Sequence, residues 1–229
     1  MAKCALIVGA GEGISASFAR VLAREGMKVG LAARNPDKLR PLPDEIGGLA
    51  FRCDVTETDE VERLFAEVDD QLGALEVVHY NPSYRAHGAL VDLDPAEVRD
   101  ALMVSAFGGF LVAQQAARRM LRQGGGAILF TGASASVKGY ARSASFAMGK
   151  FALSGIAQSM ARELAPQNIH VAHFVIDGAV RSARRQEPAD QPDSMLDPDA
   201  IAQTYLAILK QPRSAWTWEV ELRPWVERF

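Results

Sequence analysis

A glycine-rich stretch near the start of the chain has the residue types of a phosphate-binding site. Gly9-Ala10-Gly11-Glu12-Gly13 follows the apolar run Cys4-Ala5-Leu6-Ile7-Val8, which has the length of a buried strand. Apolar residues recur at helical spacing from Ile14 onwards, so a helix is predicted to begin there. Glycines let the backbone approach a pyrophosphate, and the first N–H groups of a helix face the anion. Glycines also form ordinary tight turns, but the position between a strand and a helix favours a nucleotide site.

The elements that must position this turn alternate along the chain. Strands are predicted at 4–8, 28–33, 49–54, 75–80, 127–131, 169–176 and 216–222, and helices at 14–25, 36–40, 59–72, 95–122, 145–165 and 198–210. Thr56 or Thr58 is expected to cap the third helix, and Asp94 the fourth. Gly108-Gly109 inside that fourth helix predicts close packing against a neighbour.

This alternation predicts an α/β fold with a parallel sheet flanked by helices on both faces. Residues 1–229 are expected to form a single doubly wound, Rossmann-type domain. The segment 178–197 is rich in Arg, Gln, Asp and Pro, and we expect a mobile loop there.

Composition narrows the class of protein. The formal net charge of −3 provides no basic surface for nucleic acid. Cys4 and Cys53 lie inside apolar runs and are expected to be reduced core residues. The first apolar run is too short for a signal sequence or a membrane span, so a cytoplasmic protein without membrane contact is expected. No metal ligands are expected.

In this order, the elements and motifs resemble those of the short-chain dehydrogenase/reductase family along nearly the whole chain. Gly9 and Gly13 have the spacing of the family's first two glycines, whereas Ser15 replaces the third and Val8 the usual threonine. Asp54-Val55 resembles the family's adenine-contacting pair.

Two later motifs carry the same resemblance. Tyr80-Asn81-Pro82-Ser83 stands at the family's Asn-Asn-Ala-Gly signature and keeps only Asn81. Asp177-Gly178-Ala179-Val180-Arg181-Ser182 resembles the Pro-Gly stretch that holds the nicotinamide carboxamide, with Asp177 in place of proline.

The resemblance implies a dinucleotide cofactor. Arg34 follows the second strand, where an acidic residue would bind a ribose 2′-hydroxyl and an arginine suits a 2′-phosphate. The carboxylate of Glu12 would repel the extra negative charge of a 2′-phosphate, but its side chain can turn outward. Arg34 can bind the phosphate through two hydrogen bonds, so NADP(H) is favoured over NAD(H). The expected cofactor contacts are Gly9, Gly11, Glu12, Gly13, Ile14, Arg34, Asn35, Asp54, Val55, Asn81, Pro82, Lys150, Gly178, Val180 and Ser182.

The resemblance also implies a catalytic centre, and here the sequence departs from the family. Lys150 matches the family's lysine, but Phe146 stands at the tyrosine position four residues earlier. Ala133 stands at the serine position and Ser105 at the asparagine position. In the family the tyrosine exchanges a proton with the substrate oxygen, while the lysine lowers the tyrosine's pKa and holds the ribose. Phenylalanine has no such proton.

Other polar side chains are candidate replacements for the missing groups. Ser134 and Tyr140 are possible substitutes for the missing hydroxyls. His79 lies in a predicted strand and is expected to be packed rather than reactive, and Tyr84 and His87 are expected to be loop residues.

Two functions stay open at this point. One is an NADP(H)-dependent oxidoreductase with an atypical catalytic centre and an unidentified small-molecule substrate. The other is a dinucleotide-binding protein without redox turnover, such as a sensor or a partner subunit. Arg181, Arg184 and Arg185 could meet an acidic substrate, although a charged loop is more often simply solvated. The apolar helices 95–122 and 145–165, with Trp216 and Trp218, predict a homodimer or homotetramer.

Overall fold

The computed structural model describes residues 3–227 and contains one seven-stranded sheet. Its strand order is β3-β2-β1-β4-β5-β6-β7, and every neighbouring pair is parallel. The strands are β1 (Cys4–Val8), β2 (Lys28–Ala33), β3 (Leu49–Arg52), β4 (Leu75–Tyr80), β5 (Gly126–Thr131), β6 (Ile169–Ile176) and β7 (Glu219–Leu222). The predicted Rossmann-type parallel sheet is confirmed.

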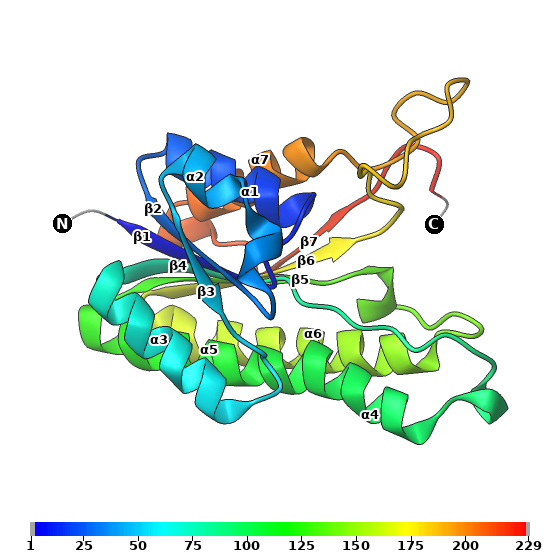
Figure 1. Cartoon of the computed structure of the whole chain (residues 1–229), viewed down its shortest axis with the longest axis horizontal. Coiled ribbons are helices and arrows are strands. Elements are labelled where there is room, and N and C mark those ends of the chain that lie inside the picture. Colours follow the sequence, from blue (N-terminus) through cyan, green and yellow to red (C-terminus); the bar gives the residue numbers. More distant parts are fainter. Residues whose placement is uncertain (1–2, 228–229) are drawn as a thin grey trace.

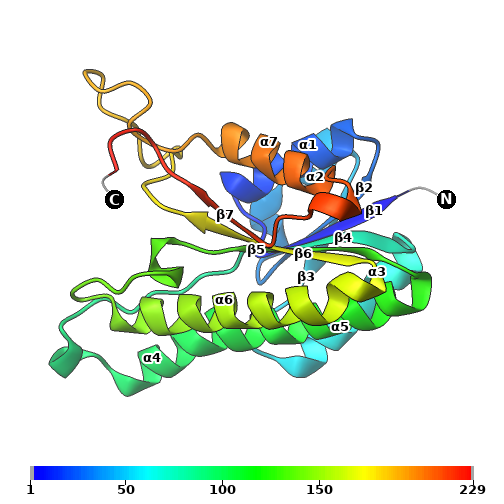
Figure 2. The same cartoon turned by 180° about the vertical axis from the view of Figure 1, so that it is seen from behind.

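Helices cover both faces of this sheet, as Figures 1 and 2 show from opposite sides. One face carries α1 (Ile14–Arg24), α2 (Leu42–Ile46) and α7 (Pro198–Leu209). The other carries α3 (Thr58–Gln71), α4 (Pro95–Leu102), α5 (Gly108–Gln123) and α6 (Ala144–Leu164). The chain therefore forms the three layers of a doubly wound domain.

The core is divided by the sheet because strand side chains alternate between its faces. In β1, Leu6 and Val8 pack with α3, α5 and α6, whereas Ala5 and Ile7 pack with α1 and α7. All four are almost fully buried. A strand buried on both faces reads as a continuous apolar run, which is why β1 was recognisable from sequence.

Three local features differ from the sequence predictions. Helix α3 has Glu57 at its N-cap position, and neither Thr56 nor Thr58 caps it. The helix predicted over 95–122 is divided by a π-helical turn, Met103–Phe107, between α4 and α5. The last strand begins only at Glu219, so the two tryptophans before it lie outside the sheet.

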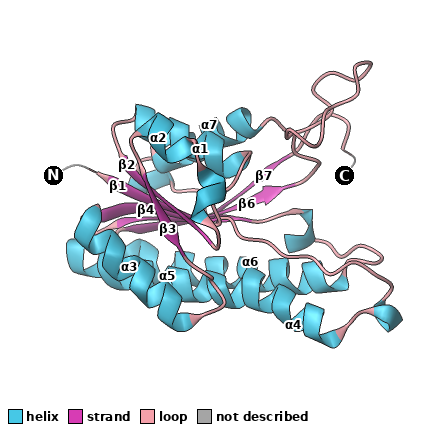
Figure 3. Ribbon diagram, viewed as in Figure 1, coloured by secondary structure: helices cyan, strands magenta, loops and turns pink. Residues whose placement is uncertain are grey.

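The strand order reverses between β1 and β4, where the connections from the two strands leave in opposite directions. In parallel α/β sheets this point, at the carboxyl ends of the strands, forms a crevice for ligands. Figure 3 shows that loops gather at this edge, and the segment between β6 and α7, gold in Figure 1, extends beyond it. No helix within residues 3–227 has the length and apolar character needed to cross a bilayer.

Candidate functional site

A cavity of about 620 Å³ occupies the switch point between β1 and β4. It brings together nine of the residues predicted to bind a cofactor: Gly9, Gly11, Glu12, Arg34, Asn35, Asp54, Val55, Asn81 and Pro82. Its walls do not include the predicted Gly13, Ile14, Lys150, Gly178, Val180 or Ser182. They do include residues that the sequence analysis did not assign to the cofactor, notably Lys38, Ser83, Tyr84, Val104 and Arg184.

The turn after β1 requires glycine for a steric reason. Gly9 has a φ of 78°, and a Cβ atom built on it would lie 2.5 Å from the backbone nitrogen of Pro82. Gly13 has a φ of 88° and precedes α1, which has no side-chain cap and no acidic residue in its first turn. The first N–H groups of α1 therefore stay free of side-chain acceptors beside the cavity, as phosphate binding requires.

Ser15 connects the two strands on either side of the switch point. Its hydroxyl donates to the Gly9 carbonyl at 3.3 Å and accepts a hydrogen bond from Asn81 Nδ2 at 2.8 Å. The side chain is buried. The sequence reasoning treated Ser15 only as a missing glycine and overlooked this structural role. Only the spatial pairing of β1 with β4 reveals it.

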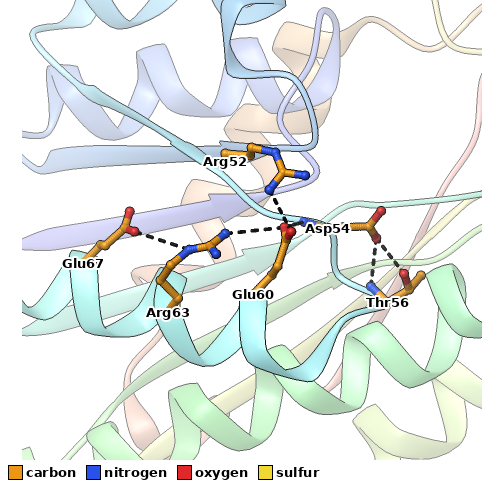
Figure 4. Close-up of polar contacts among 6 residues, drawn as sticks. All are labelled: Arg52, Asp54, Thr56, Glu60, Arg63 and Glu67. Atoms are coloured by element: carbon orange, nitrogen blue, oxygen red, sulfur yellow. Dashed lines mark hydrogen bonds and ion pairs between the residues drawn. The ribbon is translucent and has the colours of Figure 1, made fainter.

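Asp54 lies at the end of β3 within a network of polar contacts (Figure 4). Its Oδ1 accepts hydrogen bonds from the Thr56 N–H at 3.0 Å and the Thr56 hydroxyl at 2.8 Å. The Asp54 N–H donates to Glu60 Oε2 at 2.7 Å, and Glu60 also pairs with Arg52. The backbone hydrogen bond from Asp54 holds the pKa of Glu60 below its usual value, with a smaller contribution from Arg52. These contacts fix Asp54 and Val55 at the cavity wall.

Two cations line the cavity beyond the end of β2. Arg34 and Lys38 are both exposed, and neither pairs with a carboxylate among residues 3–227. Asn35 positions this segment because its side chain accepts a hydrogen bond from the Asp37 N–H and caps the short helical turn Pro36–Leu39. Glu12 is also exposed and lines the same cavity.

Lys150 is 2% exposed, on α6 behind the end of β5. Its ammonium donates to the Thr131 carbonyl oxygen at 2.8 Å, and burial lowers the pKa of Lys150 to about 8. Phe146 lies one turn earlier, with its ring centroid 5.9 Å from the Lys150 Nζ atom. A buried amine with one hydrogen-bond acceptor retains two N–H groups for a ligand.

Ser105 packs against α6, the helix that carries Lys150. Ser105 lies in the π-helical turn, fully buried, and its hydroxyl has no hydrogen-bond partner among the described residues. A Cβ atom on Gly149, next to Lys150, would lie 2.7 Å from the Ser105 Cβ, so the turn packs directly on α6. Gly109 packs equally closely on Leu153 of α6, which confirms the predicted close contact.

The other predicted catalytic positions lie in the segment between β5 and α6. The Ala133 N–H donates to the Ser136 hydroxyl at 3.1 Å, and Ser134 begins a helical turn. Tyr140 is 47% exposed and its ring contacts the Lys138 ammonium. Within the described part of the chain, no hydrogen bond links Ser134 or Tyr140 to Lys150.

His79 is packed, as expected from its position in a strand. Its Nε2 atom lies 2.7 Å from the Thr131 hydroxyl, which also bonds the Tyr205 hydroxyl at 2.9 Å. Desolvation, with a smaller contribution from Lys150, lowers the pKa of His79 to about 3. The imidazole is therefore neutral, and it supports the end of β5 without facing the cavity.

The segment 178–197 begins beside a buried carboxylate. Asp177 pairs with Lys138 at 3.3 Å and with Arg223 at 3.4 Å. Arg181 pairs with Glu187 at 3.4 Å and Asp197 at 2.5 Å, so its charge is neutralised within the segment. Of the three loop arginines, only Arg184 lines the cavity.

A larger hollow of about 700 Å³ lies at the opposite, amino-terminal edge of the sheet and contains none of the predicted site residues. Trp216, which lines it, stacks on His170 with 4.7 Å between ring centroids. This tryptophan therefore packs on its own chain, and its predicted part in an oligomer contact stays a prediction. Within residues 3–227, no group of three or more His, Cys, Asp or Glu side chains is arranged to hold a metal ion.

Comparison with known proteins agrees with this geometry. The sequence profile of the family described as "short chain dehydrogenase" matches residues 3–192. An uncharacterized oxidoreductase of Staphylococcus aureus is 29% identical over 228 residues, covering 97% of each chain. A crystal structure of a short-chain dehydrogenase from Rhodopseudomonas palustris is 37% identical, covers 97% of this chain and 99% of its own, and superimposes with a TM-score of 0.84.

A second solved structure was determined with a nucleotide. The alcohol dehydrogenase of the archaeon Thermococcus sibiricus, complexed with 5-hydroxy-NADP, is 26% identical and covers 100% of this chain and 99% of its own, with a TM-score of 0.87. The profile match over most of the chain, together with the parallel sheet and the cavity at its switch point, shows that this protein belongs to the short-chain dehydrogenase family of oxidoreductases.

Proposed function

We propose that the protein is an NADP(H)-dependent oxidoreductase of the short-chain dehydrogenase type with an atypical catalytic centre. The observation that carries the cofactor choice is the pair Arg34 and Lys38, two cations that line the cavity without a carboxylate partner among residues 3–227. A ribose 2′-phosphate would satisfy both, whereas NAD(H) would leave them unpaired. The Thermococcus sibiricus enzyme, solved with an NADP derivative, supports this choice.

The residues at the carboxyl ends of the strands would hold this cofactor. The turn at Gly9 and the free N–H groups of α1 would bind the pyrophosphate, while Asp54 and Val55 would bind the adenine. Lys150 would donate to the ribose next to the nicotinamide through the N–H groups that Thr131 does not use. Gly178, Val180 and Ser182 would hold the carboxamide, and the segment 178–197 would cover the substrate. The mobility of that segment stays a prediction.

The cofactor supplies or accepts the hydride when bound. The protein must then handle a proton, and Phe146 and Ala133 carry no group that could donate one. The proton therefore comes from water, from the substrate, or from Ser134 or Tyr140 after a local shift. A substrate that already carries a positive charge or a proton, such as an iminium, needs the missing hydroxyls less than a simple ketone does.

Fluorescence titration with NADPH and NADH tests the cofactor half of this proposal, with tighter binding of NADPH expected. Equal affinities would contradict it. The chemical half is tested by following NADPH absorbance with simple ketones and with cyclic iminium salts at saturating cofactor, where faster oxidation by the iminium salts is expected. Tight NADPH binding without oxidation by either class would instead favour the second function, a dinucleotide-binding protein without turnover.

A further inference from the structure

Arg85 lies beside the candidate catalytic centre, in the segment between β4 and α4. It directly follows Ser83 and Tyr84, which line the dinucleotide cavity. Its Nη2 atom donates a hydrogen bond to the Ser143 hydroxyl, and its guanidinium carbon lies 5.1 Å from the centroid of the Phe146 ring. The guanidinium is thus held over the ring that stands one turn before Lys150.

Neighbouring contacts fix this arrangement. The Ser145 hydroxyl donates to the Ala86 carbonyl at 2.8 Å, and both residues are buried. Ser143 occupies the N-cap position of α6 but makes no side-chain cap bond, and its hydroxyl accepts from Arg85 instead. Two consecutive loop residues are therefore tied to the first turn of α6, so the guanidinium is positioned before any ligand arrives.

The charge of Arg85 has no counter-ion in the described part of the chain. A guanidinium is always protonated and carries five N–H donors, yet its protein contacts are one hydroxyl and one aromatic face. Arg181 offers a contrast, because Glu187 and Asp197 neutralise it. Lys150 places a second cation 5.9 Å from the same Phe146 ring centroid.

We propose that Arg85 binds a carboxylate of the substrate, so that this oxidoreductase acts on an organic acid. The inference rests on the proposed function, in which Lys150 marks the nicotinamide end of the cofactor. A guanidinium stacked on an aromatic ring presents its N–H groups in a fixed plane, which suits bidentate binding of a carboxylate. Phe146 supplies that stacking surface. Arg85 sets the specificity, whereas the reacting carbon lies towards the cofactor.

Calorimetric titration of the NADP⁺-loaded protein tests this directly. The probes are benzoate, phenylacetate and 2-oxobutanoate, each paired with its amide, which has the same shape without the charge. We expect at least one carboxylate to bind about 10- to 100-fold more tightly than its amide, the effect of a hydrogen-bonded charge. In Arg85→Gln this preference should disappear. In Arg85→Lys it should be retained in part, because lysine keeps the charge but cannot bind a carboxylate through two parallel N–H groups.

Arg142→Gln is the matched control. Arg142 is exposed, lies next to Ser143 and makes no ion pair among residues 3–227, so the variant removes the same charge. It should leave the preference for the carboxylate intact. Three results would overturn the proposal: no carboxylate preferred over its amide, a preference that survives in Arg85→Gln, or phenyl phosphate binding while every carboxylate fails. A thermal melt of each variant checks that it folds. If Arg85→Gln does not fold, Arg85→Lys still tests the proposal.

Titration of the same proteins with NADPH separates this inference from the proposed function. Wild-type protein that fails to bind NADPH contradicts the proposed function. The carboxylate titration is then repeated without nucleotide, where it still reports on Arg85. Conversely, tight NADPH binding with no carboxylate preference contradicts the role of Arg85 alone.

Discussion

Replacing Lys150 with methionine tests the physical state of the candidate site without any substrate. Burial lowers the pKa of Lys150 to about 8 from an ordinary 10.5. Each pKa unit corresponds to about 1.4 kcal/mol, so keeping the ammonium charged in this position costs the folded state about 3 kcal/mol at pH 7. Methionine has similar length and no charge, and so it avoids that cost while losing the hydrogen bond to the Thr131 carbonyl.

The sign of the pH dependence follows from proton counting. Below pH 8 both the folded and the unfolded chain hold the Lys150 proton, and the full cost is present. Between pH 8 and 10.5 the folded protein has lost the proton and the unfolded chain has not, so the free energy of unfolding rises with pH. From pH 7 to pH 10 this gain is about 2.5 kcal/mol for wild type, and Lys150→Met lacks it.

Urea unfolding of both proteins at pH 7, 8, 9 and 10, without nucleotide, measures this gain as a difference. The difference cancels the contribution of the titrating groups that do not interact with Lys150. Lys28→Met is the control, because Lys28 is exposed on β2 and its ammonium stays in water, so its pH profile should parallel that of wild type. A difference between wild type and Lys150→Met that changes by less than about 0.5 kcal/mol over this range would refute the reasoning.

Four further outcomes are expected. Arg34→Asp should weaken NADPH binding by about 1.5–3 kcal/mol and reverse the preference for NADPH over NADH, measured by fluorescence titration. The double variant Phe146→Tyr with Ala133→Ser should gain about 10²–10⁴-fold in reduction of simple ketones, while robust wild-type turnover of such ketones would show that another group supplies the proton. His79→Gln should reduce acid sensitivity in urea unfolding, because the folded pKa near 3 lies below the unfolded 6.5 and wild-type stability falls as the pH drops between them. Phe110→Glu should lower the mass measured by light scattering if a homodimer or homotetramer forms through α5 and α6, whereas Val91→Glu, exposed outside these helices, should not.

The surface of α5 and α6, through which the predicted oligomer would form, is apolar. Phe110 is 42% exposed on α5 and Phe151 is 47% exposed on α6, with Phe107 and Met148 exposed beside them in sequence. The two helices lie side by side along one face of the molecule in both views (Figures 1 and 2). The sequence predicted this contact from the apolar character of the helices. Wild-type protein with the mass of one chain would contradict it.

The sequence specified most of the fold because the signals involved are local. A buried parallel strand is a short apolar run, and glycine or proline ends it, so β1, β2, β4 and β6 were placed to within a residue. The turn at Gly9 could be assigned because strand, glycines and helix are contiguous. The features that were missed depend on contacts between distant segments or on a competition between weak local preferences.

The π-helical turn at Met103–Phe107 illustrates such a feature. Its cause is visible only in three dimensions: the Tyr80 hydroxyl, at the end of β4, donates to the Val104 carbonyl at 2.5 Å. Gly108 allows this approach, because a Cβ atom there would lie 2.7 Å from the same hydroxyl. Nothing in the sequence near Val104 indicates an acceptor for a tyrosine twenty-four residues earlier. The contact of Arg85 with Phe146 was missed for the same reason.

Lys150 and Arg85 show why the candidate site is better understood as a binding site for charge than as a stable part of the core. A buried ammonium with a single backbone acceptor destabilises the folded protein, and an apolar residue of similar size would pack there at lower cost. A guanidinium without a counter-ion adds little to stability when its contacts are one hydroxyl and one ring. In our proposals, the buried Lys150 completes its hydrogen bonds with the ribose of the cofactor, and the exposed Arg85 exchanges water for the carboxylate of the substrate. The two cations contact the same ring, so a carboxylate bound to Arg85 would offset part of the positive charge beside Lys150, whereas the neutral ribose would leave that charge unchanged. Phe146 therefore joins the two proposed binding groups, even though its ring has no proton to transfer.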